Sequence, residues 1–130
     1  MKVFLLKTVL LVFFMFSHME GDIIEEIASH FQTGKTKEIS EHFASTINFS
    51  ILNDSNVYSK VQAEIILNRF LTTHEPRAAK IIHRLNNSTT YKHAVIELAT
   101  NQGKFRVSYS IRVDNNTAQI VELRIEKAIE

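Results

Sequence analysis

The first part of the chain repeats apolar residues at the spacing of α-helices. A helix is predicted over residues 22–34, because the acidic Asp22 precedes apolar positions that recur at helical spacing. A short second helix is predicted over residues 36–43, and a strand over residues 46–51. Ser59 and Gln62 have the spacing of a capping box, which predicts a third helix that starts there and ends before the proline at position 76.

From residue 77 onward the period of the apolar positions changes to 2, the period of β-strands. Turn clusters at residues 86–90, 101–103 and 114–118 separate four strand-like runs, which predicts an antiparallel meander. Loops of five, three and five residues set the predicted register. His83 is expected opposite His93, Glu97 opposite Val107, and Tyr109 opposite Leu123; Ile111 is expected opposite Val121. Because side chains alternate, the odd-numbered residues of all four strands are expected on one apolar face.

The even-numbered face is predicted to carry most of the charge of the sheet. Arg106 is expected opposite Glu126, a favourable cross-strand pair. Five apolar residues interrupt this face as a partial patch that a second subunit could cover: Ile82, Ala94, Ile96, Leu98 and Ile120. A homodimer through the sheet face is therefore one association that the sequence allows.

The first 19 residues are interpreted as a secretory signal peptide. Lys2 and Lys7 precede an uninterrupted apolar run at residues 9–16, after which the chain turns polar. The run spans roughly 12 Å, much less than the ~30 Å hydrocarbon core of a bilayer. We expect cleavage between residues 17 and 21, export to the periplasm or the cell exterior, and no stable membrane span in the remaining single domain, residues 20–130. An uncleaved N-terminal anchor is the alternative.

Composition limits the chemistry that this domain offers. The formal charge is +1, and it becomes −1 after loss of the signal peptide, which removes two lysines and no acid. That balance argues against a nucleic-acid partner, because nucleic-acid binders normally carry a basic face. The absence of cysteine excludes disulfides, thiol nucleophiles and cysteine-held metals. The sequence has no Gly-rich phosphate loop, Gly-x-Ser-x-Gly motif or His-Glu-x-x-His motif, so no cofactor is predicted.

Six short motifs, in order and spacing, resemble a known family. They are residues 22–27 (DIIEEI), Gly34, residues 57–64 (VYSKVQAE), residues 80–83 (KIIH), residues 103–107 (GKFRV) and residues 123–126 (LRIE). Over about residues 20–126 the chain resembles the secreted bacterial domain-of-unknown-function 4783 family, in the nuclear-transport-factor-2-like (cystatin-like) superfamily.

The resemblance implies an α+β cone, in which N-terminal helices pack on a strongly curved antiparallel four-strand meander plus one short earlier strand or hairpin. It also implies a cavity at the open end of the cone and often a homodimer. It implies no reaction, because the superfamily hosts both enzymes and binding modules.

The candidates for lining the cavity are polar and aromatic residues. They lie on the predicted sheet face and in the segment before the long helix: Tyr58, His83, Tyr91, His93, Glu97, Phe105 and Tyr109. His83 and His93 are weak metal candidates, with Cβ atoms expected about 5 Å apart. The nearest carboxylate on that face, Glu97, lies about 13 Å along the strand from His93, so no metal site is assigned. His30 and His42 are interpreted as surface residues, because neither has a ligand partner three or four residues further along.

Glu97 is the weak catalytic candidate. Between Val95 and Ala99, and opposite Val107, its carboxylate would be desolvated, an environment suited to general acid–base chemistry.

The favoured function is a non-catalytic exported module that binds a small apolar ligand or an envelope protein through the cone cavity or the sheet face. One alternative is a cavity enzyme with isomerase-, dehydratase- or hydrolase-like chemistry, using Glu97 with a histidine or tyrosine. The other is a purely structural dimerisation domain whose cavity is filled by its own side chains. Burial of Phe105 and Tyr109 would favour a filled cavity, and a surface ion pair at Glu97 would argue against catalysis.

Overall fold

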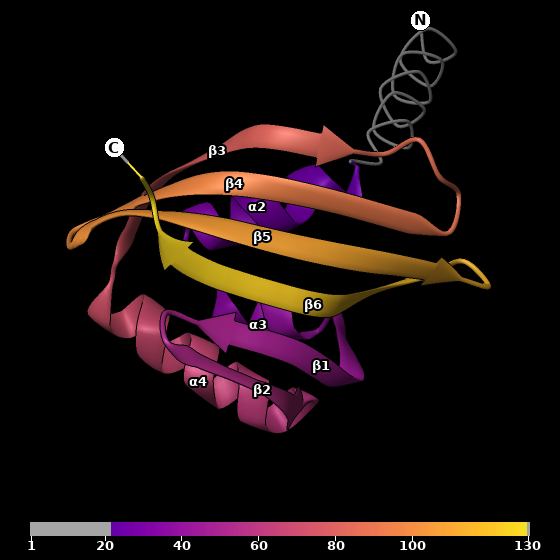
Figure 1. Cartoon of the computed structure of the whole chain (residues 1–130), viewed down its shortest axis with the longest axis horizontal. Coiled ribbons are helices and arrows are strands. Elements are labelled where there is room, and N and C mark those ends of the chain that lie inside the picture. Colours follow the sequence, from indigo (N-terminus) through magenta and orange to yellow (C-terminus); the bar gives the residue numbers. More distant parts are fainter. Residues whose placement is uncertain (1–21, 130) are drawn as a thin grey trace, which may run out of the picture.

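The structure is a computed structural model that describes residues 22–129 (Figure 1). The predicted signal peptide and its cleavage region lie outside these residues. The elements described are α2 (Ile23–Gln32), α3 (Thr36–Ser40), β1 (Phe43–Ile51), β2 (Asp54–Ser59), α4 (Lys60–Thr73), β3 (Pro76–Leu85), β4 (Tyr91–Thr100), β5 (Gly103–Asp114) and β6 (Thr117–Lys127). Among them, no helix is both long and apolar enough to cross a membrane.

The strands form one six-stranded sheet in the order β2-β1-β6-β5-β4-β3. All neighbours are antiparallel except β1 and β6, which pair in parallel and join the first hairpin to the meander. The helices cover one face of the sheet, with α2 behind the meander and α4 beside β1 and β2 (Figure 1). The predicted α+β class, with helices on a curved meander and an earlier hairpin, is confirmed.

Local signals place α2 and α4 where the sequence predicts them, whereas α3 ends at Ser40 and β1 begins at Phe43, three residues before the predicted strand. Asp22 caps α2, with its Oδ1 accepting a hydrogen bond from the Ile24 N–H at 3.0 Å. Ser59 caps α4: its Oγ accepts from the Gln62 N–H at 3.2 Å, and Gln62 Oε1 accepts from the Ser59 N–H at 3.1 Å. The predicted capping box is therefore confirmed.

Replacing the cap of α4 gives a modest prediction. Ser59→Ala is expected to lower the free energy of unfolding by about 1 kcal/mol, because the Gln62 N–H loses its acceptor. Urea unfolding followed by circular dichroism measures the change. Ser45→Ala, at an exposed position of β1, is the matched control and should stay within about 0.5 kcal/mol of the wild type. Equal losses in both variants would contradict this role of the cap.

The core lies between the helices and the inner face of the sheet. Its largest fully buried side chains come from α2, α3, α4 and the strands: Tyr109, Phe31, Phe43, Phe49, Ile24, Ile27, Ile39, Ile47, Leu67, Ile96, Leu98 and Ile111. Opposite β5 and β6 residues, such as Tyr109 with Leu123 and Arg106 with Glu126, lie in the predicted register, although the side chains of Arg106 and Glu126 form no ion pair. The sheet therefore has an apolar inner face and a more polar outer face.

The predicted register of β4 against β5 is wrong by one residue. Thr100 pairs with Gly103 across a two-residue turn, so Glu97 opposes Arg106 and Leu98 opposes Phe105. A one-residue slip moves every side chain of a strand to the other face. Ala94, Ile96 and Leu98 therefore lie in the core, and the odd-numbered residues of β4 lie on the outer face.

Two irregularities change the other registers. Pairing shifts between Ile81 and His83 in β3, so His83 opposes Val95, and the predicted His83–His93 pair does not form. In β6, a shift lets Ile111 oppose Ile120 in place of Val121. The second shift accompanies a tight turn at Asn115 and Asn116, whose positive φ angles of 48° and 63° suit a two-residue hairpin.

The slip and the shift also remove most of the predicted outer patch. Ala94, Ile96, Leu98 and Ile120 are fully buried in the core. Ile82 alone among the five stays exposed, at 43%. An apolar patch built from these residues therefore does not exist on the outer face.

Candidate functional site

Aromatic side chains fill the interior between the sheet and the helices. Tyr109 is fully buried, stacks on Phe31 with ring centroids 6.3 Å apart, and donates its hydroxyl hydrogen bond to the Ile24 carbonyl at 2.7 Å. Phe105 is 3% exposed and meets the Phe70 ring edge-on at 5.2 Å. Both residues were predicted to line a cavity, and both belong to the packed core. Their burial favours the hypothesis that side chains of the protein itself fill the cone.

The surroundings of Tyr109 and Tyr58 raise the pKa values of their hydroxyl groups. Burial raises the pKa of Tyr109 well above its ordinary value; Arg84 opposes this effect and Asp22 adds to it. Tyr109 is therefore a neutral hydrogen-bond donor. The hydrogen bond from the Tyr58 hydroxyl to Asp54 Oδ2, at 2.8 Å, raises the pKa of Tyr58. Both groups hold structure in their protonated form.

The remaining predicted site residues lie on the outer side of the sheet. His83 and Tyr91 are exposed, and His93 Nδ1 lies 3.0 Å from the hydroxyl oxygen of Ser110. Glu97 forms an ion pair with Lys104, whose Nζ lies 3.6 Å from the carboxylate. The seven predicted residues thus do not surround one cavity, and Glu97 occupies the outer position that argues against catalysis.

The outer face carries a shallow groove across β2, β1 and β6. Its volume is about 290 Å³, and its outer-face lining is mainly polar: Asn48, Ser50, Ser55, Val57, Glu122 and Arg124. Glu122 and Arg124 form no ion pair with any described residue. The groove is suited to polar groups of a partner and offers little apolar surface.

Beside the groove, four charged residues form one row across β6, β5, β4 and β3. Glu126 opposes Arg106, Arg106 opposes Glu97, and Glu97 opposes Lys80, so their side chains share the outer face. The row alternates in sign from one strand to the next. Arg106 is half-buried and has no carboxylate oxygen within 4.0 Å among the described residues.

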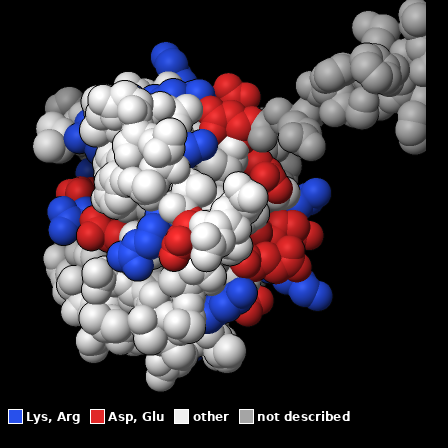
Figure 2. Space-filling view, turned by 90° about the vertical axis from the view of Figure 1, so that its right-hand side faces the viewer, with Lys and Arg blue, Asp and Glu red and all other residues white. Residues whose placement is uncertain are grey.

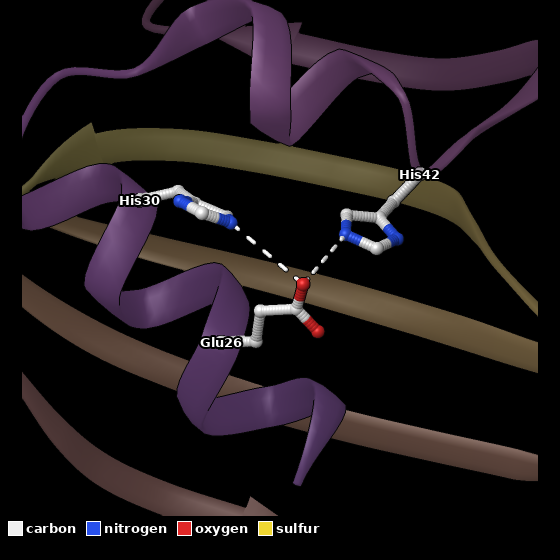
Figure 3. Close-up of side chains that lie close together, drawn as sticks. All are labelled: Glu26, His30 and His42. Carbon is white, nitrogen blue, oxygen red and sulfur yellow. Dashed lines mark ion pairs between the residues drawn. The ribbon is translucent and has the colours of Figure 1, made fainter. Parts of the chain in front are cut away.

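A second constellation lies on the helical side and is missed by the sequence interpretation. Glu26 and His30 stand one turn apart on α2, and His42 lies in the turn between α3 and β1 (Figure 3). The Nε2 atoms of His30 and His42 lie 3.8 and 3.7 Å from the same oxygen, Glu26 Oε1. One donor atom of each residue lies within 4.8 Å of the other two.

The missed signal is partly visible in the sequence. Glu26 precedes His30 by four residues on a predicted helix, a spacing that puts both side chains on one face. The partner of His30 precedes it in the chain, whereas the sequence interpretation rests on the residues that follow it. His42 has no such local signal, because the short α3 and its turn bring this residue back beside α2.

Comparisons with known proteins agree with this architecture. The profile of a family described as domain of unknown function (DUF4783) matches residues 24–126. No curated protein matches the chain. Among solved structures, a DUF4783 family protein from Bacteroides uniformis ATCC 8492 is 24% identical with a TM-score of 0.78, covering 84% of this chain and 100% of that chain.

Two further structures extend the likeness. A DUF4783 family protein from Bacteroides ovatus ATCC 8483 is 23% identical with a TM-score of 0.74, covering 80% of this chain and 94% of that chain. A domain of unknown function with a cystatin-like fold from Nostoc punctiforme PCC 73102 is 9% identical with a TM-score of 0.63, covering 82% of this chain and 73% of that chain. At these identities the structural likeness establishes the fold alone.

Proposed function

The chain belongs to the DUF4783 family, and from that premise we propose that it is an exported, non-catalytic interaction module that pairs with a second copy of itself through the outer face of its sheet. Export rests on the Lys-flanked apolar run at residues 9–16. The observation that carries the pairing is the charged row of Glu126, Arg106, Glu97 and Lys80.

The row is complementary to itself under two-fold rotation. Across the sheet, the charges of the row are negative, positive, negative and positive. A second copy that is turned by 180° about an axis in the interface, parallel to the strands and through the middle of the row, presents these charges in the opposite order. A copy docked about that axis sets Arg106 against the partner's Glu97, and Glu126 against the partner's Lys80. Two-fold dimers use the same patch on both subunits, so self-complementarity is what such an interface requires.

The surroundings of Arg106 support an external partner. Glu97 makes its ion pair with Lys104 at 3.6 Å, and Glu126, opposite Arg106 on β6, forms no ion pair with it. The half-buried guanidinium therefore has no carboxylate within 4.0 Å among the described residues. A partly buried charge is favourable when it is paired. A second copy supplies carboxylates at this position.

The other functions considered for this fold have less support. Binding of a small apolar ligand in the cone needs space that Tyr109 and Phe105 occupy. Acid–base catalysis by Glu97 needs a desolvated carboxylate, and the side chain of Glu97 is 37% exposed and paired with Lys104. A surface that binds a protein partner is consistent with both observations.

Charge reversal tests the proposed interface. The wild-type protein is expected to sediment as a dimer at micromolar concentration, and Arg106→Glu is expected to weaken the dimer at least about tenfold, because it faces the partner's Glu97 twice per dimer. The double variant Arg106→Glu with Glu97→Arg restores a self-complementary row and should regain dimerisation. Sedimentation equilibrium measures all three dissociation constants.

Arg69→Glu provides the matched control. It makes the same charge change at an exposed position of α4, away from the sheet face, and should leave the dissociation constant unchanged. A wild-type protein that is still monomeric at about 100 µM would contradict the proposal. A double variant whose dimer dissociates as readily as that of Arg106→Glu would also contradict it.

A further inference from the structure

The cluster of Glu26, His30 and His42 has the chemistry of a transition-metal site. Two imidazoles and one carboxylate are ligands typical of zinc centres that keep a fourth position for water. The cluster lies on α2 and the α3–β1 turn, on the helical side and away from the proposed dimer face (Figures 1 and 3). We propose that these three residues bind one divalent first-row transition ion, for which Zn²⁺ is the probe.

The distances fit a site that closes around an ion. In a tetrahedral zinc site with bonds of 2.0–2.1 Å, ligand atoms lie about 3.3 Å apart. The two His–Glu distances of 3.8 and 3.7 Å exceed this separation by no more than 0.5 Å. The ligand atoms of all three residues lie within 4.8 Å of one another, so closure needs side-chain rotations that bring the two imidazoles together by up to about 1.5 Å. The carboxylate of Glu26, 48% exposed, leaves a path for the ion.

The positions of the ligands are fixed by the backbone. Glu26 and His30 belong to the same helix, whose N-terminus is capped by Asp22. His42 is held at both backbone groups: its N–H donates to the Ile39 carbonyl at 3.1 Å, and its carbonyl accepts from the Ile120 N–H at 2.7 Å. The histidine side chains are 21% and 23% exposed. A bound ion would link α2 to the turn where β1 begins.

Hydrogen bonding alone does not account for the arrangement. Both His–Glu separations exceed the usual 2.7–3.2 Å range of such bonds. Across residues 22–129, the rings of His30 and His42 make no hydrogen bond, whereas those of His74 and His93 each do. The two partly buried imidazoles thus lie at ion-pair distance from one carboxylate oxygen and form no hydrogen bond with it (Figure 3). A metal ion would serve as the shared partner of all three groups.

Charged residues of both signs surround the cluster. Asp and Glu side chains gather on the side of the molecule where the helices lie, with Lys and Arg side chains among them (Figure 2). The first turn of α2 carries both Glu25 and Glu26, and α3 carries Glu38. Arg84 pairs with Glu25 at 3.2 Å and Lys37 also lies on α3, so Glu26 is the carboxylate that faces the two histidines. The imidazole ligands select a transition ion over Ca²⁺ and Mg²⁺, which prefer oxygen ligands.

Isothermal titration calorimetry tests the site on protein purified without a histidine tag and stripped of metal with a chelator. Zn²⁺ is expected to bind at one ion per chain with a dissociation constant of about 1 µM or tighter. His42→Ala and Glu26→Gln should each weaken binding at least about 100-fold, because changes even to outer partners of metal ligands cost 10–100-fold. His83→Ala, an exposed histidine on the sheet, should bind Zn²⁺ like the wild type.

A second measurement separates loss of the ligand from loss of the fold. Zn²⁺ should raise the melting temperature of the wild type and of His83→Ala, and leave that of His42→Ala and Glu26→Gln unchanged. Glu26→Gln is nearly isosteric at a half-exposed position, so its metal-free melting temperature should equal that of the wild type. X-ray absorption should find two imidazoles at about 2.0–2.1 Å from the zinc. No binding by the wild type, or equal binding by His42→Ala, would overturn the proposal.

Discussion

Leu98→Gln is expected to lower the free energy of unfolding by about 2–5 kcal/mol, a large part of the 5–15 kcal/mol typical of small domains. Leu98 is fully buried opposite Phe105, so the substitution removes apolar contacts and buries an amide among apolar side chains. Ala99→Gln, one residue further on, puts the same amide on the outer face and should cost no more than about 0.5 kcal/mol.

Urea unfolding of this matched pair tests the face of β4 as well as the size of the effect. The three-residue loop predicted from the sequence would bring Ala99 into the core and move Leu98 outside. It therefore predicts the reverse order of stability. A larger loss for Ala99→Gln than for Leu98→Gln would restore that register and remove the charged row on which the proposed dimer rests.

Tyr109→Ala is expected to cost about 3–5 kcal/mol, the range for removing a large buried aromatic side chain. The variant loses the stack on Phe31 and the hydrogen bond to the Ile24 carbonyl. Tyr109→Phe keeps the ring and removes only the hydroxyl, which should cost about 1 kcal/mol. Thermal and urea unfolding of both variants separate packing from hydrogen bonding; equal losses would contradict this division.

The same hydroxyl makes stability depend on alkaline pH. Because burial raises the pKa of Tyr109 in the folded protein, the unfolded chain releases this proton first, at about pH 10. The stability that the group contributes is complete below pH 10 and is lost above it, by up to about 1.4 kcal/mol per pH unit. Tyr109→Phe should lack this part of the alkaline decline, whereas Tyr91→Phe, at an exposed position, should retain it. Parallel declines in wild type and Tyr109→Phe would exclude Tyr109 as the cause.

The sequence predicts the helices and the order of the strands because their signals are local. The Ser59–Gln62 capping box starts α4, and the change of apolar period marks the beginning of the meander. A parallel pairing of β1 with β6 has no local signal, since it joins segments far apart in the chain. Such pairing depends on how the hairpin and the meander pack against the same helices.

The register of β4 is ambiguous in the sequence for a physical reason. Ala94, Ile96 and Leu98 alternate with Val95 and Ala99, so either face of this strand is apolar enough to be buried. The length of one turn then decides between them. Gly103, predicted to end a loop, is the first residue of β5, with a φ of 108° that side chains rarely adopt.

The candidate sites depend on the same distinction between local and distant signals. The Glu26–His30 pair follows from helical spacing and was open to prediction. His42 joins it only through the tertiary path of α3, and the charged row of the outer face appears only with the correct β4 register. Of the lining residues predicted for the cavity, Tyr109 and Phe105 became core because aromatic rings fill the cone.

The parallel pairing of β1 with β6 also has a kinetic consequence. Ile51 pairs with Ile125, and the two residues are 74 positions apart in the chain. Contacts between such distant segments slow folding, because a long loop must close before they form. During synthesis, β1 has no partner on its β6 side until residues 120–125 have emerged. The local hairpins can pair earlier, but the complete six-stranded sheet forms only after nearly all of the chain has been made.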